Sequence, residues 1–296
     1  MPRRVLIIVN PAAGRMRSRR RRLDRVVGAL QRLGCPVTVR DAAGAPGMAE
    51  ALARSAEPEF DVIVAAGGDG TVAAVINGIA AAPRAVAILP FGTANVLAAE
   101  IGVPRDAEAQ AAMIAAGPAR SFWPGRLDGR LFVTSAGAGF DAAVVAAVDP
   151  RVKRWGGRLA FAWASIVCLM RHHDRDVTVK ADGVVHRAGA AIATTGPLYA
   201  GRFLIAPAAR PEDPDLGLVL LPGGGRRAVL RCGAALLLGR LPRARGVAIL
   251  KARSISIVGE AGEPVQADGD IAAHLPLTLE IAPYSIPLIH PGGAPR

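Results

Sequence analysis

Over the first hundred residues, short apolar runs typical of buried strands alternate with segments of helical periodicity. The apolar runs are Val5–Val9, Pro36–Arg40, Asp61–Ala65 and Ala85–Leu89. Because short apolar strands separated by helices form parallel sheets covered on both faces, we expect a doubly wound α/β domain over residues 1–123.

After about residue 120 the pattern changes, and strand-like runs dominate. Helical segments are expected only at Arg158–Met170 and Arg227–Leu238. Many short strands joined by Gly and Pro turns predict a mostly antiparallel β-sandwich over residues 124–290, with a boundary near Phe122–Pro124 and the chain end near 285–296 able to pack back on the first domain. The expected strands are Leu131–Ser135, Asp176–Ala181, Ala188–Thr194, Leu216–Leu221, Ser254–Val258, Leu277–Ile281 and Ser285–Ile289.

The charge balance indicates an anionic partner. The chain has 36 Lys+Arg against 24 Asp+Glu, a formal charge of +12, and only three of the basic residues are lysines. Charge alone leaves nucleic acid, an anionic membrane and a phosphorylated small molecule open. The guanidinium fork of arginine suits bidentate phosphate contacts, although a coding bias would give the same excess.

Turns without bulky side chains follow the strands of the first half. Asn10–Gly14 comes directly after the first strand, and Gly67-Gly68-Asp69-Gly70-Thr71 comes after the third. Glycines let the backbone approach a ligand, and the following helix adds its positive end, so the second turn is a candidate phosphate site. A carboxylate at Asp69 would repel bare phosphates, which predicts a Mg²⁺ ion between them. The alternative is a tight strand-to-helix turn with Thr71 as its N-cap.

A third loop, Pro90–Asn95, offers the hydroxyl of Thr93 and the amide of Asn95 on the same sheet edge. Familiar nucleotide motifs are absent from the sequence. There is no G-x-x-x-x-G-K-[ST] and no G-x-G-x-x-G after the first strand, which argues against a P-loop NTPase and against a Rossmann dehydrogenase.

In their order and spacing, Asn10–Gly14, Gly67–Thr71 and Leu89–Ala98 resemble the bacterial diacylglycerol kinase and sphingosine kinase catalytic-domain family of lipid kinases. Gly137–Ala142 and Ala267–Asp270 are similar to later landmarks of that family. The resemblance implies an ATP-binding α/β half and a lipid-substrate β-sandwich half, with the site in the cleft between them.

The resemblance also implies which residues contact ATP. A nucleotide-binding Thr of the family has no match at Arg40–Gly44. The expected contacts are Asn10, Pro11, Ala12, Ala13, Gly14, Gly67, Gly68, Asp69, Gly70, Thr71, Val72, Thr93 and Asn95.

Catalytic and metal-binding residues are implied in the same way. The carboxyl-terminal Asp-Gly-Glu of the family, whose Glu is the base or metal-linked acid, reads Asp268-Gly269-Asp270 here, so Asp270 and Asp69 are the catalytic candidates. Asp141 would orient the acceptor, or else cap a helix. A structural Mg²⁺ would be held by Asp213 and the backbone carbonyls of Arg210 and Asp215, against the alternative of a solvated acidic loop.

A lipid acceptor lies in a bilayer, so we expect docking on an anionic membrane. Basic residues flank both helical segments of the second half, although core helices with solvated basic ends would look the same. Nucleic acid is not expected, because aromatic residues make up only 4% of the chain. The flanking residues are Arg151, Lys153, Arg154, Arg158, Arg171 and Arg175 around the first segment, and Arg226, Arg227, Arg240, Arg243 and Arg245 around the second.

Three widely spaced cysteines and the lack of a signal-like segment predict a cytoplasmic protein associated peripherally with the inner membrane face, and a homodimer is left open. The leading hypothesis is an ATP- and Mg²⁺-dependent lipid kinase. The alternatives are a soluble kinase related to NAD kinases or phosphofructokinases, and a non-catalytic nucleotide-binding, membrane-associated regulator.

Overall fold

A computed structural model describes residues 1–10, 16–43, 45–139, 142 and 176–292. The chain divides into two compact units, Met1–Phe122 with Tyr284–Arg296, and Trp123–Pro283. The helix expected at Arg158–Met170 lies outside the described residues.

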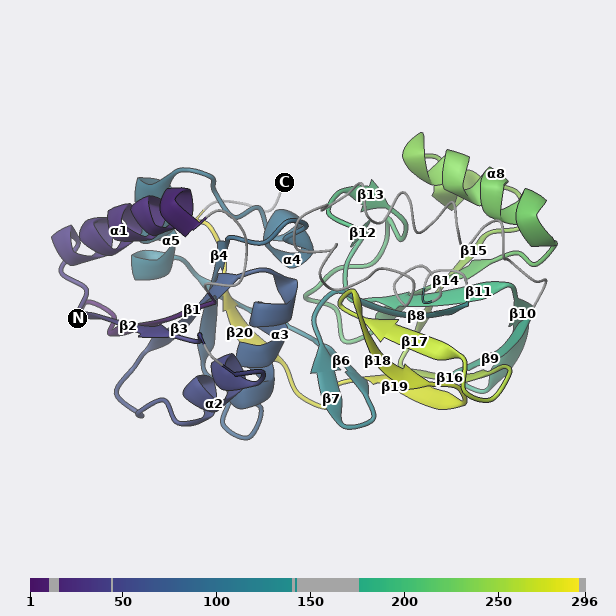
Figure 1. Cartoon of the computed structure of the whole chain (residues 1–296), viewed down its shortest axis with the longest axis horizontal. Helices are drawn as coiled ribbons and strands as arrows, with labels where there is room; N and C mark the ends of the chain where they lie inside the picture. Colours follow the sequence, from purple (N-terminus) through teal and green to yellow (C-terminus); the bar gives the residue numbers. More distant parts are fainter. Residues whose placement is uncertain (11–15, 44, 140–141, 143–175, 293–296) are drawn as a thin grey trace. The chain divides into compact units, whose positions relative to one another are not determined.

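The first unit is built on one six-stranded sheet (Figure 1). Its neighbouring strands are parallel from β2 to β20, and only β5 runs antiparallel to β20 at the edge. The chain therefore returns from the second unit to supply the strand between β4 and β5. The strands in spatial order are β2 (Val37–Asp41), β1 (Val5–Val9), β3 (Val62–Gly67), β4 (Ala85–Pro90), β20 (Ile286–Ile289) and β5 (Ala119–Phe122).

Helices cover both faces of this sheet, as the alternating sequence pattern predicts (Figure 1). Helices α1 (Met16–Arg32) and α5 (Ala107–Ala116) pack together on one face, and α2 (Met48–Arg54) and α3 (Asp69–Gly78) pack together on the other. Strand β3 is buried over its whole length, and β1 and β4 are buried except at their ends, because helices cover both faces of the sheet. A short helix, α4 (Val96–Glu100), follows β4.

The second unit is a β-sandwich of two antiparallel six-stranded sheets. Alternate side chains of both sheets fill one core, in which Val177, Ile255 and Leu279 of the first sheet meet Ala136, Ala191 and Leu218 of the second. The first sheet runs β10 (Val184–Ala188), β9 (Val177–Ala181), β16 (Ser254–Val258), β19 (Leu277–Ile281), β6 (Gly125–Leu127), β7 (Arg130–Phe132). The second runs β15 (Ala248–Ala252), β14 (Leu216–Leu221), β11 (Ala190–Thr194), β8 (Ser135–Gly139), β17 (Pro264–Ala267), β18 (Asp270–His274).

A third apolar cluster lies on the outer face of the second sheet. Ile192 and Val219 project outward there and pack against helix α8 (Gly225–Leu237), through Cys232 of the helix, and against Leu241 of a following 3-10 turn. A two-stranded ribbon, β12 (Leu198–Tyr199) with β13 (Phe203–Leu204), lies beside this cluster. The predicted fold class is thus confirmed in both units. Among helices of the described residues, none has the length and hydropathy needed to cross a membrane.

Two expected strands are wrong in detail. The run Leu131–Ser135 is split between β7 and β8, because the N–H groups of Val133 and Thr134 donate to the carboxylate of Asp268 instead of to a neighbouring strand. The run Ala188–Thr194 is split at Gly189, between β10 and β11, which belong to different sheets.

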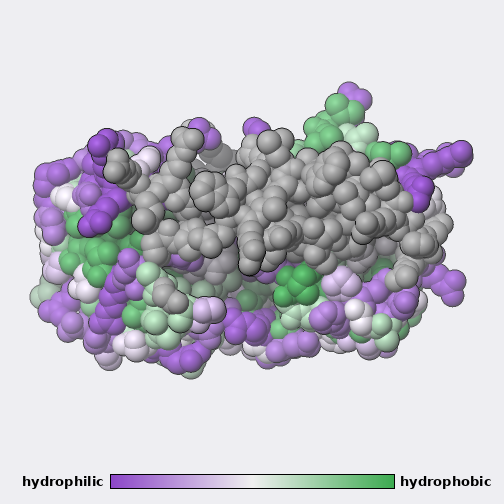
Figure 2. Space-filling view, viewed as in Figure 1, coloured by the Kyte–Doolittle hydropathy of each residue, from purple (hydrophilic) through white to green (hydrophobic). Residues whose placement is uncertain are grey.

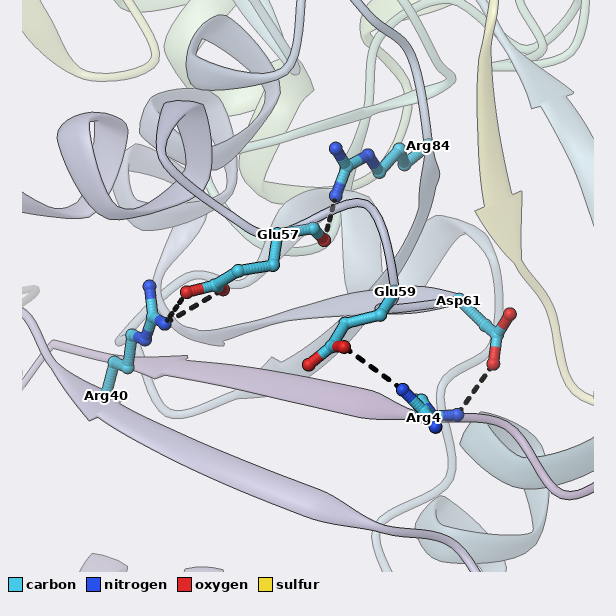
Figure 3. Close-up of polar contacts among 6 residues, drawn as sticks. All are labelled: Arg4, Arg40, Glu57, Glu59, Asp61 and Arg84. Atoms are coloured by element: carbon cyan, nitrogen blue, oxygen red, sulfur yellow. Dashed lines mark hydrogen bonds and ion pairs between the residues drawn. The ribbon is translucent and has the colours of Figure 1, made fainter.

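Charged side chains tie the segments that precede β1, β3 and β4 to one another and to Arg40, the fourth residue of β2 (Figure 3). The Asp61 carboxylate accepts the N–H of Arg4 at 2.7 Å, and the Arg4 guanidinium pairs with Glu59. Glu57 accepts from Arg40 with both carboxylate oxygens, at 2.6 and 2.9 Å, and its backbone carbonyl accepts from Arg84. These contacts fix the segments that lead into β1, β3 and β4, and open α/β sheets bind ligands beyond the carboxyl ends of their strands.

Candidate functional site

Asn10 and the loops Gly67–Thr71 and Pro90–Asn95 lie at the carboxyl ends of β1, β3 and β4. In the sheet register Val9 lies beside Ala66, and Gly67 lies beside Pro90. Asn10, Gly67 and Pro90 therefore leave the sheet at one edge, where open α/β sheets bind ligands.

Asn10 fastens the first loop to the second. Its side-chain amide donates to the hydroxyl oxygen of Thr71 at 3.2 Å, and its backbone N–H donates to the carbonyl of Ala66 at 3.1 Å. The Thr71 side chain is buried directly over Gly67, where any Cβ would overlap it. The alternative in which Thr71 caps a helix is wrong, because α3 begins at Asp69 with Gly68 as its N-cap and Thr71 lies in the first turn.

The second and third loops touch through their backbones. The N–H groups of Phe91 and Gly92 both donate to the carbonyl of Gly67, at 2.8 and 3.1 Å. A Cβ on Gly92 would overlap the Cα of Gly68, and a Cβ on Gly68 would lie 3.2 Å from the Cα of Gly92. Gly68 and Gly92 are therefore required for the two loops to approach each other.

Asp69 is anchored to the start of α4. Its two carboxylate oxygens accept the backbone N–H groups of Val96 at 3.0 Å and Leu97 at 3.3 Å. Burial raises the pKa of Asp69, while these two N–H groups act in the opposite direction. The carboxylate thus ties the second loop to the element that follows the third.

The two polar side chains of the third loop have different surroundings. Asn95 closes the loop on itself, because its Oδ1 accepts the N–H of Gly92 and its Nδ2 donates to the carbonyl of Gly92, both at 2.8 Å. Thr93 is exposed at the tip of the same loop. The hydroxyl of Thr93 is therefore accessible to a ligand, whereas the amide of Asn95 shapes the loop.

The electrostatics of this edge favour an anion. The N-terminus of the ten-residue helix α3 lies in the second loop, and the dipole of the helix gives this end partial positive charge. The guanidinium of Arg22 lies 5.6 Å from the ring centre of Phe91, which brings a cation from α1 to the third loop. Burial lowers the pKa of Arg22, opposed by the nearby charge of Asp106. Backbone N–H groups, a helix end and a nearby cation can together bind phosphate.

Other expected site residues lie elsewhere. Pro11, Ala12, Ala13 and Gly14 of the first loop, and Asp141, fall outside the described residues. Gly70 is exposed in the first turn of α3, and Val72 is buried behind it. Asp270 belongs to the second unit.

Asp270 is exposed at the first position of β18, directly after a two-residue hairpin turn. The turn is formed by Asp268 and Gly269, whose φ angles of 51° and 84° are both positive, and Ala267 pairs with Asp270 across it. The Asp268 carboxylate accepts from the N–H of Thr134 and from its hydroxyl, both at 2.7 Å. Asp268 thus anchors the hairpin that presents Asp270.

The acidic loop Pro211–Asp215 forms ion pairs with a lysine side chain of the same chain. The ammonium nitrogen of Lys251 lies 2.9 Å from Oδ2 of Asp213 and 3.2 Å from Oδ1 of Asp215. The carbonyl of Arg210, the third expected metal ligand, accepts the N–H of Asp213 within the turn. These residues do not fit a resident Mg²⁺, because the ammonium already sits among the carboxylate oxygens that the metal would need.

Two contacts near the candidate sites could not be predicted from local sequence patterns. The anchoring by Asp268 and the cation at Lys251 both join residues far apart in the chain, 134 positions for Asp268 and Thr134 and 38 for Lys251 and Asp213. A signal for Lys251 was present, because it is one of only three lysines in a chain that otherwise uses arginine. The anchoring role of Asp268 has no comparable signal, because three other Asp-Gly pairs occur in the sequence, at Asp69, Asp128 and Asp182.

Comparison with known families covers nearly the whole chain. Residues 4–127 match the family model of the diacylglycerol kinase catalytic domain. Residues 134–290, more than half of the chain, match that of the YegS C-terminal NAD kinase beta sandwich-like domain.

Individual relatives agree with these matches. A protein named diacylglycerol kinase from Bacillus subtilis is 26% identical over 279 residues, covering 93% of this chain and 92% of the relative. One of the same name from Staphylococcus saprophyticus is 26% identical over 280 residues, with the same coverage. A crystal structure described as a diacylglycerol kinase from Bacillus anthracis superposes with a TM-score of 0.77 at 23% identity, covering 98% of this chain and 97% of that one, which shows a shared fold.

Proposed function

This chain belongs to the family of diacylglycerol kinase catalytic domains with a YegS-type C-terminal domain, and on that premise we propose that it transfers the γ-phosphoryl group of ATP to a hydroxyl of a membrane lipid such as diacylglycerol. The observation that carries the proposal is the joining of Asn10 and the second and third loops at the carboxyl edge of β1, β3 and β4. Diacylglycerol is the favoured acceptor because the curated relatives carry that name.

The first unit binds ATP in this proposal. The N-terminus of α3 receives the phosphates, Gly68 and Gly92 let the backbone come close, and the exposed hydroxyl of Thr93 donates to a phosphate oxygen. Asn10 contributes by fixing Thr71, and through it the first turn of α3.

A Mg²⁺ ion carried with ATP would supply charge neutralisation at the phosphates. Asp69 acts as a positioning residue in our proposal. Its carboxylate fixes the N–H groups of Val96 and Leu97 and thereby the spacing of the second and third loops, since both of its oxygens already accept these hydrogen bonds.

Asp270 is proposed as the proton acceptor. As the acceptor oxygen forms its bond to the γ-phosphorus, the bond from that phosphorus to the leaving ADP oxygen breaks, and the hydroxyl proton passes to the Asp270 carboxylate. A lipid hydroxyl does not ionise at neutral pH, so the proton needs such an acceptor. Aspartate is one methylene shorter than the family's Glu, which makes Asp270→Glu an informative variant.

The function is tested by incubating the purified chain with γ-labelled ATP, Mg²⁺ and mixed micelles containing diacylglycerol, ceramide, a sphingoid base or monoacylglycerol. We expect label in one phosphorylated lipid. Label in NAD or a sugar phosphate but in no lipid would establish the NAD-kinase-like or phosphofructokinase-like alternative. ATP binding without any labelled product would establish the non-catalytic regulator.

Two variants separate the proposed roles. Asp69→Ala is expected to abolish turnover and also to lower the stability of the first unit by about 1 to 3 kcal/mol, because two buried N–H groups lose their acceptor. Asp270→Asn is expected to abolish turnover with an unchanged melting temperature, because Asp270 is exposed. Melting curves and initial rates measured on the same preparations check both. An Asp270→Asn enzyme with full rate would show that Asp270 is not the proton acceptor.

A further inference from the structure

Helix α8 covers the outer apolar cluster of the second unit with only one of its sides. Ala228 and Cys232 are buried on that side. On the other side three leucines remain largely exposed, Leu230 at 58%, Leu237 at 73% and Leu238 at 69%. Figure 2 shows this as hydrophobic (green) surface over α8, with hydrophilic (purple) side chains beside it. Exposed leucines gathered on one helix mark an interaction surface.

The leucines share their face with arginines. Residues 227, 230, 231, 234, 237 and 238 recur at helical spacings of three and four, so Arg227 and Arg231 lie among the leucines. No Asp or Glu occurs in the sequence between Asp215 and Glu260. The same stretch contains eight basic residues: Arg226, Arg227, Arg231, Arg240, Arg243, Arg245, Lys251 and Arg253.

We propose that the exposed face of α8 is the surface that docks this protein on an anionic lipid bilayer. Leucines on a helix of 13 residues can enter the acyl boundary while the arginines contact lipid phosphates, which is the arrangement of an interfacial helix. Arg227 and Arg231 on this exposed face complement the negative charge of an anionic lipid surface. The proposal deepens the proposed function, since a lipid acceptor has to be reached in a bilayer.

Docking is tested without any substrate. The purified chain is floated with vesicles of phosphatidylglycerol and phosphatidylcholine, or of phosphatidylcholine alone, in the absence of diacylglycerol. We expect binding to the anionic vesicles only, weakening as salt is raised. The variant Leu230→Ser/Leu237→Ser/Leu238→Ser is expected to bind about tenfold more weakly or worse, because the apolar contribution to interfacial binding is lost.

The matched control is Val184→Ser/Val185→Ser, which removes two side chains exposed to 60% and 61% on β10 and is expected to bind as the unaltered chain does. Equal binding by the leucine variant overturns the proposal. So does a chain that is dimeric in solution and becomes monomeric in the leucine variant without losing vesicle binding, since α8 would then be an interface between copies. Vesicle binding with no lipid phosphorylation would contradict the proposed function alone.

A second, independent inference concerns the acidic loop Pro211–Asp215 of the second unit. Lys251 lies on β15, and the pairing of β15 with β14 places it opposite Gly217, two residues after Asp215. Its ammonium thereby reaches both Asp213 and Asp215. The hydrogen bonds to these carboxylates raise the pKa of Lys251, so the charge is present at every physiological pH.

We infer that the Lys251 ammonium replaces the structural divalent cation that the family resemblance implies at this loop. A single fixed positive charge at 2.9 and 3.2 Å from two carboxylates supplies the neutralisation for which the loop would otherwise need a metal. The folded second unit therefore does not depend on Mg²⁺.

Thermal melting tests this inference apart from activity. The melting temperature of the unaltered chain is expected to be the same in a chelator and in millimolar Mg²⁺. Lys251→Met is expected to melt lower in chelator and to regain stability with Mg²⁺ or Ca²⁺, because the carboxylates become available to a metal. Lys180→Met, on β9, is the matched control and should respond to neither. A chelator-sensitive unaltered chain, or a Lys251→Met variant that binds no metal in calorimetric titration, overturns the inference.

Discussion

At the scale of single residues, the candidate nucleotide site depends on glycines, which have no side chain, as much as on residues with polar side chains. Gly67 leaves room for Thr71, and Gly68 and Gly92 allow two loops to touch. Asn95 and Asp69 then fix the loops through hydrogen bonds to backbone groups. The expected ATP contacts therefore include residues that shape the site without reaching the ligand.

Gly92→Ala is predicted to destabilise the first unit by about 1 to 3 kcal/mol, because its methyl group would overlap the backbone of Gly68. We also expect weaker ATP binding, since the third loop must move. Chemical denaturation and nucleotide titration measure the two effects.

Gly70→Ala is the matched control for that variant. A Cβ at Gly70 has no neighbour within 4 Å, and the residue lies in the first turn of α3. Stability should be unchanged or slightly higher, because alanine favours a helix. Any loss of ATP affinity in this variant would then reflect an altered contact with ATP itself and not a change in loop packing. Gly92→Ala with unaltered stability would contradict the close packing of the two loops.

At the scale of elements, three Asp-Gly hairpin turns recur in the second unit, and each has two positive φ angles. They follow β6, β9 and β17. In two of them the Asp carboxylate also binds backbone N–H groups of another segment, Asp182 those of Arg253 and Ser254, and Asp268 those of Val133 and Thr134. The Asp-Gly part of the carboxyl-terminal motif is thus a turn and an anchor, and the residue after it, Asp270, is free to differ in role.

Asp268→Gly is predicted to lower stability by about 1 to 3 kcal/mol more than Asp128→Gly does. Glycine tolerates the positive φ at both positions, at 51° and 47°, so the turns themselves keep their geometry. The difference therefore reports the lost hydrogen bonds to Val133 and Thr134. Denaturant melts of the two variants check it, and equal losses would show that Asp268 anchors nothing.

The ion pair between Arg40 of β2 and Glu57 predicts a pH dependence (Figure 3). The hydrogen bond from Arg40 holds the pKa of Glu57 below its usual value. A lowered folded-state pKa gives stability above the unfolded pKa, about 4.3, that is lost as pH falls through the folded value. Glu57→Gln should therefore melt lower than the unaltered chain at pH 7, and the gap should close below about pH 4.

The same comparison in an Arg40→Gln background is the control, because the partner of Glu57 is then gone. A gap that persists unchanged at low pH would contradict the role of this pair.

Local patterns predicted the elements of the first unit well, because strands such as Val5–Val9 are short, apolar and followed by small-residue turns. They failed where the determining contact is distant. The strand expected at Leu131–Ser135 is broken by Asp268, and Lys251 meets an acidic loop 36 to 38 positions earlier. Pairing of β20 with β4 joins residues about 200 positions apart, which no local periodicity encodes.

At the scale of the whole molecule, the excess of 12 positive charges is divided among different tasks. Arg22 of α1 lies beside the third loop of the candidate nucleotide site in the first unit, and arginines of α8 lie beside exposed leucines in the second. Lys251 neutralises an internal acidic loop. We thus propose that most of the positive charges serve membrane docking and contacts within the fold, while the glycine backbone and the N-terminus of α3 bind the nucleotide.

The central claim is that this chain phosphorylates a lipid hydroxyl with Asp270 as proton acceptor. The most direct measurement is the initial rate of label transfer from γ-labelled ATP to diacylglycerol in mixed micelles, for the unaltered chain, Asp270→Asn and Asp270→Glu side by side. We predict labelled phosphatidic acid from the unaltered chain, loss of about a hundredfold or more in Asp270→Asn, and retained turnover in Asp270→Glu. Equal rates for all three, or no labelled lipid from any, would contradict the account.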